Sequence, residues 1–218
     1  MLGYKTYLDL IPELIEGREV VSSAMMQEVD RSRKALEMAT SGKTVSLVSG
    51  GDPGIYAMAG LVFEMAQQQD SQVTIEVIPG IAAVNGCAAR LGAPLMHDFA
   101  AISLSDLLTP WPLIEKRLDA AASADFVIAI YNPKSKKRTE HIVKAREIIL
   151  KHRSPETPVG VVTAATRENE QITLTTLGNL LEADINMQST VIIGNSMTFR
   201  WRDYLITPRG YSDKYKLT

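Results

Sequence analysis

Cysteine is almost absent from the chain. It occurs once among 218 residues, at Cys87. A single thiol forms no intrachain disulfide and supplies no cysteine cluster for zinc or iron–sulfur, so we expect Cys87 to be a small buried apolar residue. The three histidines, His97, His141 and His152, have no metal-ligand spacing. The sequence therefore predicts no metal site.

The chain also lacks long apolar runs and an excess of charge of either sign. No apolar run approaches the ~18 residues of a membrane span, and the N-terminal MLGYKTYLDL has no basic region followed by an apolar core. Lysine plus arginine number 23 against 25 for aspartate plus glutamate, a net charge of -2. We therefore expect neither nucleic acid nor a membrane as a partner, and a cytoplasmic location.

Common catalytic motifs are missing as well. The chain has no GxSxG, HExxH or C-x-x-C motif, and no GxGxxG or GxxxxGK[ST] loop that would cradle phosphates. His97 is followed by Asp98, and the two could form an acid–base pair. The alternative is a structural histidine, because adjacent side chains often point apart. Spacing alone thus predicts no nucleophile.

What the chain does contain is an alternation of short β-rich runs and longer helical patterns, which is typical of an α/β protein. The runs are mostly continuous in apolar character, which suits strands covered on both faces, as in parallel sheets. The stretch over residues 92–112 interrupts this alternation, and a boundary near residues 95–100 within it predicts two domains, 1–97 and 98–218. Predicted strands span 44–49, 73–78, 125–131, 158–163 and 189–194, and predicted helices span 23–41, 55–69, 81–91, 111–122, 136–152 and 175–183.

The stretch SGGDPG follows a predicted strand and precedes a predicted helix. In an open parallel sheet this is the carboxyl edge, where ligands bind. Gly50 and Gly51 would let a ligand approach the backbone closely, because neither carries a Cβ. Asp52 could hold a hydroxyl or ammonium group of that ligand, or it could cap a helix starting near Ile55. The residues leave both possibilities open.

Two further strand ends carry unusual sequences. VIPGIAAVNGCAARLG continues into a helix of small residues, which permit either close helix packing or a flat ligand beside the helix start. AIYNPKSKKR places four cations within five residues. Such a run is usually a solvated face, but at the end of a strand it could receive a polyacidic ligand.

Four blocks carry a resemblance that runs across nearly the whole chain: VSGGDPGIYAMAG, VIPGIAAVNGCAARLGAPLMHDFAAISLSD, AIYNPKSKKR and STVIIGNSMTFRWRDYLITPRGY. They resemble the tetrapyrrole (corrin and porphyrin) methyltransferase family. The last three most resemble its branch that methylates C17 of precorrin-3B or cobalt-factor III and contracts the macrocycle in cobalamin biosynthesis. The resemblance implies a homodimer of two α/β domains of the tetrapyrrole methylase type with a cofactor cleft between them. Domain 1–97 would form the acceptor side and domain 98–218 the cofactor side.

The resemblance also implies S-adenosylmethionine as the methyl donor and an acidic tetrapyrrole as the acceptor. His97 and Asp98 are candidates, by position, for the acid–base help that ring contraction requires. The implied cofactor-binding residues are Gly50, Gly51, Asp52, Ile55, Ala82, Ala83, Tyr131, Ala165 and Thr190. The candidate substrate-binding residues are Tyr4, Lys5, Arg90, Lys134, Lys136 and Arg138.

The N-terminus departs from the family pattern. Family members generally begin with a strand and a Gly-Pro-Gly loop, whereas this chain begins near the tyrosine–lysine segment that follows them. We therefore expect the first N-terminal strand of the fold to be absent. Two alternatives to methylation of a corrin precursor stay open. One is methylation of another acceptor, such as uroporphyrinogen or a modified protein histidine, and the other is a catalytically silent tetrapyrrole-binding or assembly subunit.

Overall fold

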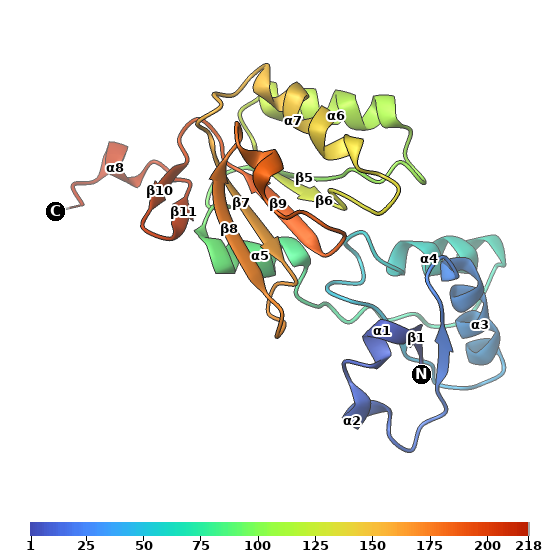
Figure 1. The fold of residues 1–218 in the computed structure, drawn as a ribbon. Helices are drawn as coiled ribbons and strands as arrows, with labels where there is room; N and C mark the ends of the chain where they lie inside the picture. The colour runs from blue at the N-terminus through green and yellow to red at the C-terminus, as the bar shows by residue number, and fades with distance from the viewer. Residues whose placement is uncertain (218) are drawn as a thin grey trace. The chain divides into compact units, whose positions relative to one another are not determined.

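The computed structural model describes residues 1–217 (Figure 1). The contacts divide the chain into two compact units, Met1–Ala82 and Ala83–Thr218, called here the first and the second unit. Each unit combines helices with a sheet, as the α/β prediction requires. The predicted boundary between residues 97 and 98 falls inside the second unit, and the domain limits stay a prediction.

The first unit contains a three-stranded sheet in the order β2-β1-β3, in which both outer strands run parallel to β1. Its small core includes Leu2, Leu8, Leu36 and Met58. Helix α3 contacts both α4 and β1. The elements are β1 (Leu2–Tyr4), α1 (Lys5–Leu8), α2 (Pro12–Ile15), β2 (Val21–Ser23), α3 (Glu28–Thr40), β3 (Leu47–Val48) and α4 (Ala59–Gln68).

The predicted strand over residues 73–78 is wrong: these residues take no regular structure. The run VTIEVI has a strand-like composition, but a strand exists only where a neighbour completes its backbone hydrogen bonds. No strand in the described part of the chain pairs with it. The two predicted helices of this unit are also shorter than expected. β2 occupies the start of the first helix, and a left-handed Tyr56 (φ 52°) precedes the second.

The second unit is built on a five-stranded sheet in the order β5-β6-β9-β7-β8. Only β5 and β6 pair in parallel, and the other neighbouring strands pair antiparallel, so the prediction of a parallel sheet is wrong for most of these pairings. Continuous apolar runs require two covered faces, and antiparallel strands meet that requirement as well. The strands are β5 (Phe99–Ser103), β6 (Val127–Tyr131), β7 (Pro158–Thr163), β8 (Gln171–Thr176) and β9 (Ser189–Ile193).

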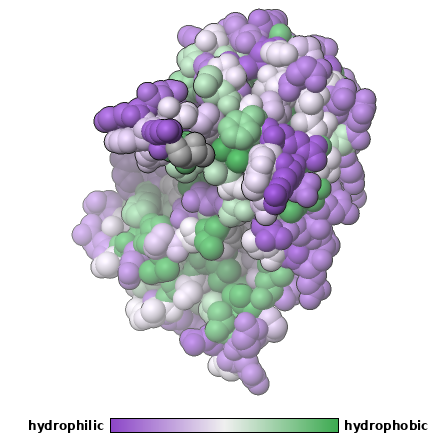
Figure 2. Space-filling model, turned by 90° about the vertical axis from the view of Figure 1, so that its left-hand side faces the viewer, coloured by the Kyte–Doolittle hydropathy of each residue, from purple (hydrophilic) through white to green (hydrophobic). Residues whose placement is uncertain are grey.

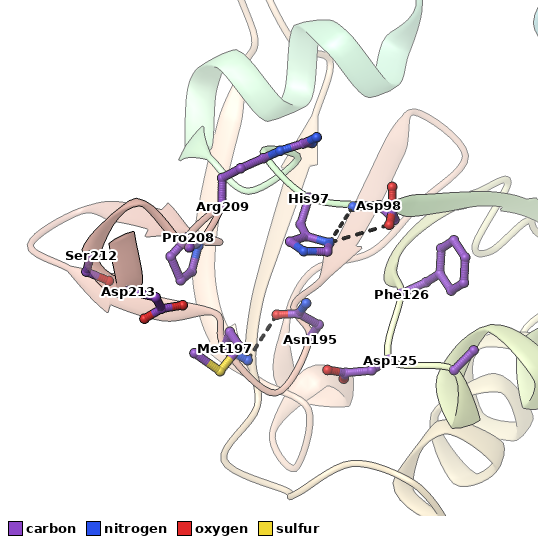
Figure 3. A pocket seen from close by; sticks show the side chains of 12 residues that line it. His97, Asp98, Asp125, Phe126, Asn195, Met197, Pro208, Arg209, Ser212 and Asp213 are labelled. Carbon is purple, nitrogen blue, oxygen red and sulfur yellow. Dashed lines mark hydrogen bonds and ion pairs between the residues drawn. The ribbon is translucent and has the colours of Figure 1, made fainter. Parts of the chain in front are cut away.

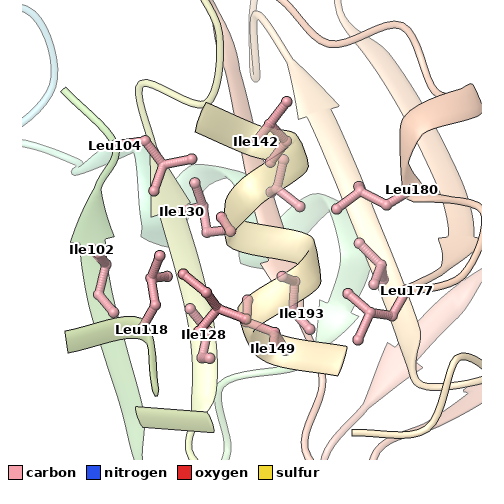
Figure 4. Packing of buried hydrophobic residues seen from close by; sticks show 14 of the residues in the cluster. Ile102, Leu104, Leu118, Ile128, Ile130, Ile142, Ile149, Leu177, Leu180 and Ile193 are labelled. Atoms are coloured by element: carbon pink, nitrogen blue, oxygen red, sulfur yellow. The ribbon is translucent and has the colours of Figure 1, made fainter. Parts of the chain in front are cut away.

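Helices cover both faces of this sheet. α6 (Trp111–Ser123) and α7 (Glu140–Leu150) bury one face, and side chains such as Leu118, Ile130 and Ile149 form its core (Figure 4). α5 (Ala83–Leu91) contacts β7 and β9. A Cβ on Gly160 of β7 would come within 2.5 Å of the Leu91 side chain, so the glycine makes room for the helix.

The rest of the second unit includes a hairpin and two short helical segments. The hairpin forms a sheet in the order β10-β11-β4. Figure 2 views the molecule from the side on which the hairpin lies in Figure 1, and hydrophobic and hydrophilic residues are interspersed there. No helix among residues 1–217 is long and apolar enough to cross a membrane. The elements are β4 (Gly92–Ala93), η1 (Leu180–Glu182), β10 (Phe199–Trp201), β11 (Tyr204–Ile206) and α8 (Tyr211–Lys214).

Most of the strands and helices predicted for this unit are confirmed, but one predicted helix is wrong and several short strands were not predicted. The predicted helix over 175–183 is wrong, because β8 takes its start and only one turn of η1 follows. The β-branched and alternating run QITLTT favours a strand. β5 lies in the stretch for which no strand was predicted.

Candidate cofactor site

The glycine loop after β3 is closely packed. A Cβ on Gly50 would come within 2.7 Å of the Tyr7 ring, and Gly51 has a left-handed φ of 73°. A Cβ on Gly80 would overlap the carbonyl of Gly51, so the two loops meet backbone to backbone. Only glycine satisfies these positions without strain.

Asp52 joins these two loops. Its Oδ1 accepts the backbone N–H of Gly54 at 2.8 Å, and its Oδ2 accepts that of Gly80 at 3.1 Å. The helix-cap alternative is wrong, because α4 begins at Ala59 and has no side-chain cap. Each carboxylate oxygen accepts one hydrogen bond here and can accept a second, so Asp52 can still hold a ligand donor.

Two other predicted cofactor residues of the first unit differ in exposure. The side chain of Ile55 is 41% exposed, whereas Ala82 is buried at 4%. Ile55 therefore offers an apolar side chain to a ligand, and Ala82 can offer little more than its backbone.

In the second unit, three predicted residues meet at one edge of the sheet. β6 ends at Tyr131 and β7 ends at Thr163, and antiparallel β9 begins at the same edge, where Val162 lies opposite Thr190. Ala165 lies two residues after the end of β7. The strand directions thus bring Tyr131, Ala165 and Thr190 together from distant parts of the sequence.

The first turns of α5 lie over this edge. The backbone N–H of Val84 donates to Oη of Tyr131 at 2.8 Å, which satisfies one of the free N–H groups of the helix start. A Cβ on Gly86 would lie 3.9 Å from the Ala165 methyl group, an ordinary contact. Ala83 begins the helix and is exposed, so the helix start and the sheet edge together present small side chains and accessible backbone.

Cys87 lies on the same helix and is 2% exposed, as predicted. Burial raises the pKa of its thiol, and a hydrogen bond with Thr190 opposes that shift. The thiol is therefore protonated near neutral pH and acts as a packing group.

The basic residues of the run AIYNPKSKKR differ in whether they already have partners. Arg138 donates from Nη2 to the carbonyl of Asn132 at 2.9 Å and from Nη1 to Oγ of Ser105 at 3.4 Å, so it holds its own loop. No acidic side chain among the described residues pairs with Lys134 or Lys136. These two lysines remain available to an anionic ligand.

The other candidate substrate residues already have partners. Lys5 pairs with Asp9 at 2.8 Å, and Arg90 pairs with Glu170 at 2.7 Å. The ring of Tyr4 meets that of Tyr7 edge-on, with centroids 5.3 Å apart. A substrate role for these residues stays a prediction.

His97 and Asp98 lie elsewhere. They precede β5, and because β5 runs parallel to β6, they stand at the opposite edge of the sheet from Tyr131. Nδ1 of His97 accepts the backbone N–H of Asp98 at 2.9 Å. Both residues line a cavity of about 350 Å³, together with Asn195 and Arg209 (Figure 3). Their catalytic role stays a prediction, and this placement does not support it.

Sequence reasoning missed the acidic residue that joins α5 to the loop after β7. Glu170 is the last residue of the charged stretch TRENE, which has no distinguishing local signal. Only its ion pair with Arg90, 80 positions away, distinguishes it from the other acidic residues nearby.

Comparison with known proteins identifies the family. The model of the tetrapyrrole (corrin/porphyrin) methylases matches residues 2–181. The chain belongs to this family. The tetrapyrrole methylase fold and the family resemblance predicted from the sequence are both confirmed.

Two curated relatives of this tetrapyrrole methylase are closely similar. The "Cobalt-factor III methyltransferase" of Priestia megaterium is 52% identical over 221 residues, which cover all of this chain but 41% of that protein. The "Probable cobalt-factor III C(17)-methyltransferase" of Salmonella typhimurium is 48% identical, over 97% of this chain and 88% of that protein. The chain thus spans less than half of the first relative and most of the second.

Solved structures agree with this assignment. The methyltransferase CobJ is 37% identical, with a TM-score of 0.87 over 95% of this chain and 87% of that one. A uroporphyrin-III C-methyltransferase from Thermus thermophilus, solved with S-adenyl homocysteine, has a TM-score of 0.66 at 21% identity over 88% of this chain and 84% of that one. At that identity the likeness concerns the fold alone.

Proposed function

We propose that the protein uses S-adenosylmethionine to methylate C17 of a corrin precursor, cobalt-factor III or precorrin-3B, with ring contraction, in cobalamin biosynthesis. The observation that carries this proposal is the 48% identity to the Salmonella typhimurium protein, of which the chain covers 88%. The tetrapyrrole methylase fold, shared with CobJ, supports it.

The residues present fit the methyl donor. In the first unit, Gly50 and Gly51 expose backbone, and Asp52 has spare acceptor capacity for an ammonium or a ribose hydroxyl. In the second unit, small side chains at the sheet edge leave the backbone accessible to a flat purine. The residues proposed to hold the donor are Gly50, Gly51, Asp52, Ile55, Ala82, Ala83, Tyr131, Ala165 and Thr190.

Bound S-adenosylmethionine supplies a methyl group on a sulfonium that is already a good leaving group. The protein therefore needs mainly to align donor and acceptor and to exclude water, and it needs no nucleophile for this step. Lys134 and Lys136 would dock carboxylates of the acidic acceptor. A role for His97 and Asp98 in the acid–base steps of ring contraction stays a prediction.

The proposal extends to assembly and location. The family resemblance favours a homodimer in the cytoplasm. Size-exclusion chromatography with light scattering is expected to give twice the chain mass of 23.9 kDa. A monomer at micromolar concentration would contradict the homodimer.

Methyl transfer can be tested with a panel of acceptors. The protein is incubated with S-adenosylmethionine and, separately, cobalt-factor III, precorrin-3B or uroporphyrinogen III, and products are identified by mass spectrometry. We expect one added methyl group on at least one of the first two acceptors and none on uroporphyrinogen III. A product from uroporphyrinogen III alone would place the protein elsewhere in the family, and binding without turnover would indicate a silent subunit.

A further inference from the structure

One ion pair connects the two parts of the second unit that carry proposed donor-binding residues. Arg90 lies in the last turn of α5, the helix that begins with Ala83. Its Nε donates to Oε1 of Glu170 at 2.7 Å. Glu170 directly precedes β8. The pair therefore fixes α5 to the connection between β7 and β8.

The same carboxylate holds the loop after β7. Oε2 of Glu170 accepts the backbone N–H of Thr166 at 2.6 Å, next to Ala165. This hydrogen bond lowers the pKa of Glu170, and Arg90 lowers it further. The side chain of Glu170 is 14% exposed, so water screens these contacts only in part.

The loop has an unfavourable backbone that needs such a restraint. Ala164 and Thr166 are left-handed, with φ values of 50° and 65°, although neither is a glycine. A left-handed conformation is unfavourable for a residue with a Cβ and persists only where its surroundings enforce it. Ala165, between them, approaches Gly86 of α5. The loop thus presents Ala165 in a conformation that the chain does not favour by itself.

We propose that Glu170 is a positioning residue for the methyl donor: by holding Thr166 and Arg90 at once, it fixes Ala165 in place beside α5. This inference rests on the proposed function. Glu170 acts through Ala165 and does not touch the reacting atoms. Its loss is therefore expected to weaken donor binding, because the donor must then order the loop when it binds.

The expected kinetic pattern separates positioning from catalysis. Glu170→Ala is expected to raise the KM for S-adenosylmethionine and the Kd for S-adenosylhomocysteine about tenfold, the size of one charge-assisted hydrogen bond. The kcat at saturating donor and the KM for the acceptor stay unchanged. Glu170→Gln keeps an acceptor oxygen for Thr166, so it is expected to restore most of the affinity and leave a roughly threefold loss.

Glu19→Gln is the matched control. Glu19 also pairs with a cation at 2.7 Å, Lys43, and its pKa is also lowered, mainly by its hydrogen bond with that lysine. It belongs to the first unit, whereas the loop after β7 belongs to the second. We expect unchanged donor affinity in this variant.

Calorimetry with S-adenosylhomocysteine and hydrogen exchange at the Thr166 amide give independent readouts. Faster exchange in Glu170→Ala together with weaker binding supports the positioning role. Wild type and Glu170→Ala binding with the same Kd would overturn it and leave the proposed function intact. If Glu170→Ala does not fold, Arg90→Gln, which removes the cation of the pair, decides in the same way. A wild-type protein that binds no S-adenosylhomocysteine would overturn both.

Discussion

The sheets of the two units are buried to different extents. All residues of β6 and β9 are buried, whereas Leu47 and Val48 of β3 are only partly so. In the second unit, helices cover both faces of the sheet and each apolar run became a paired strand. In the first unit, the equally apolar run over 73–78 has no partner strand among the described residues. An apolar run thus predicts a strand only where the fold supplies a neighbour for it.

Core truncation is expected to give the largest difference between the units. Ile130 is fully buried in β6, and Ile130→Ala is expected to lower the free energy of unfolding by about 3 kcal/mol, because it leaves a cavity. Val77 is 40% exposed in the unpaired run, and Val77→Ala is expected to change stability by less than about 0.5 kcal/mol. Urea denaturation measures the free energy of unfolding of both variants. Equal losses of stability would contradict the difference between the two units.

Two glycines give the next largest effect, with opposite signs. Gly160→Ala is expected to destabilise the protein by about 1–3 kcal/mol, since the new Cβ would collide with Leu91. A Cβ on Gly60, in α4 of the first unit, would meet no atom of the described residues within 4 Å. Gly60→Ala is therefore expected to stabilise the protein by up to ~1 kcal/mol. Thermal unfolding distinguishes the two, and a stabilising Gly160→Ala would contradict the packing of α5.

Asp52 tests the loop of the first unit. Asp52→Ala leaves the N–H groups of Gly54 and Gly80 without their acceptor and removes the proposed contact with the donor. We expect S-adenosylhomocysteine affinity to fall at least about tenfold, and less in Asp52→Asn, which keeps one acceptor oxygen. The measurement is calorimetric. Unchanged affinity in Asp52→Ala would remove this loop from the donor site.

The smallest expected effect is on the pH dependence of stability. The pKa of Glu170 is lowered in the folded state, first by the Thr166 hydrogen bond, so its contribution is present above the unfolded pKa. It is lost as the pH falls through the lowered folded value, below the ordinary range of glutamate. Urea denaturation of Glu170→Gln between pH 7 and 3 should show a shallower loss in acid than wild type. A steeper loss of stability in the variant would contradict the lowered pKa of Glu170 in the folded state.

Much of the second unit could be predicted because turn-forming residues clearly separate its apolar and helical segments. Glycines, prolines and long apolar runs marked β6, β7, β9 and the three main helices. β1 and β2 were not predicted because three-residue strands are too short for a periodic pattern. The direction of the strands could not be predicted, because an antiparallel strand that is buried on both faces has the same composition as a parallel one.

The candidate site was predictable in part for a similar reason. The glycines before Asp52 and the strand end at Tyr131 have local signals. The contacts of Asp52 with Gly80 and of Glu170 with Arg90 join positions 28 and 80 residues apart. No local sequence pattern indicates such a pairing, so the role proposed for Glu170 rests on the structure alone.

The position of the new methyl group is the most direct test of the proposed function. The protein is incubated with cobalt-factor III and S-adenosylmethionine that carries ¹³C in its methyl group, and the product is examined by NMR. The proposed function predicts a single labelled methyl group, attached to C17 of a contracted ring. Label at another ring carbon would contradict it, and so would a lack of label in the tetrapyrrole with precorrin-3B as well as with cobalt-factor III.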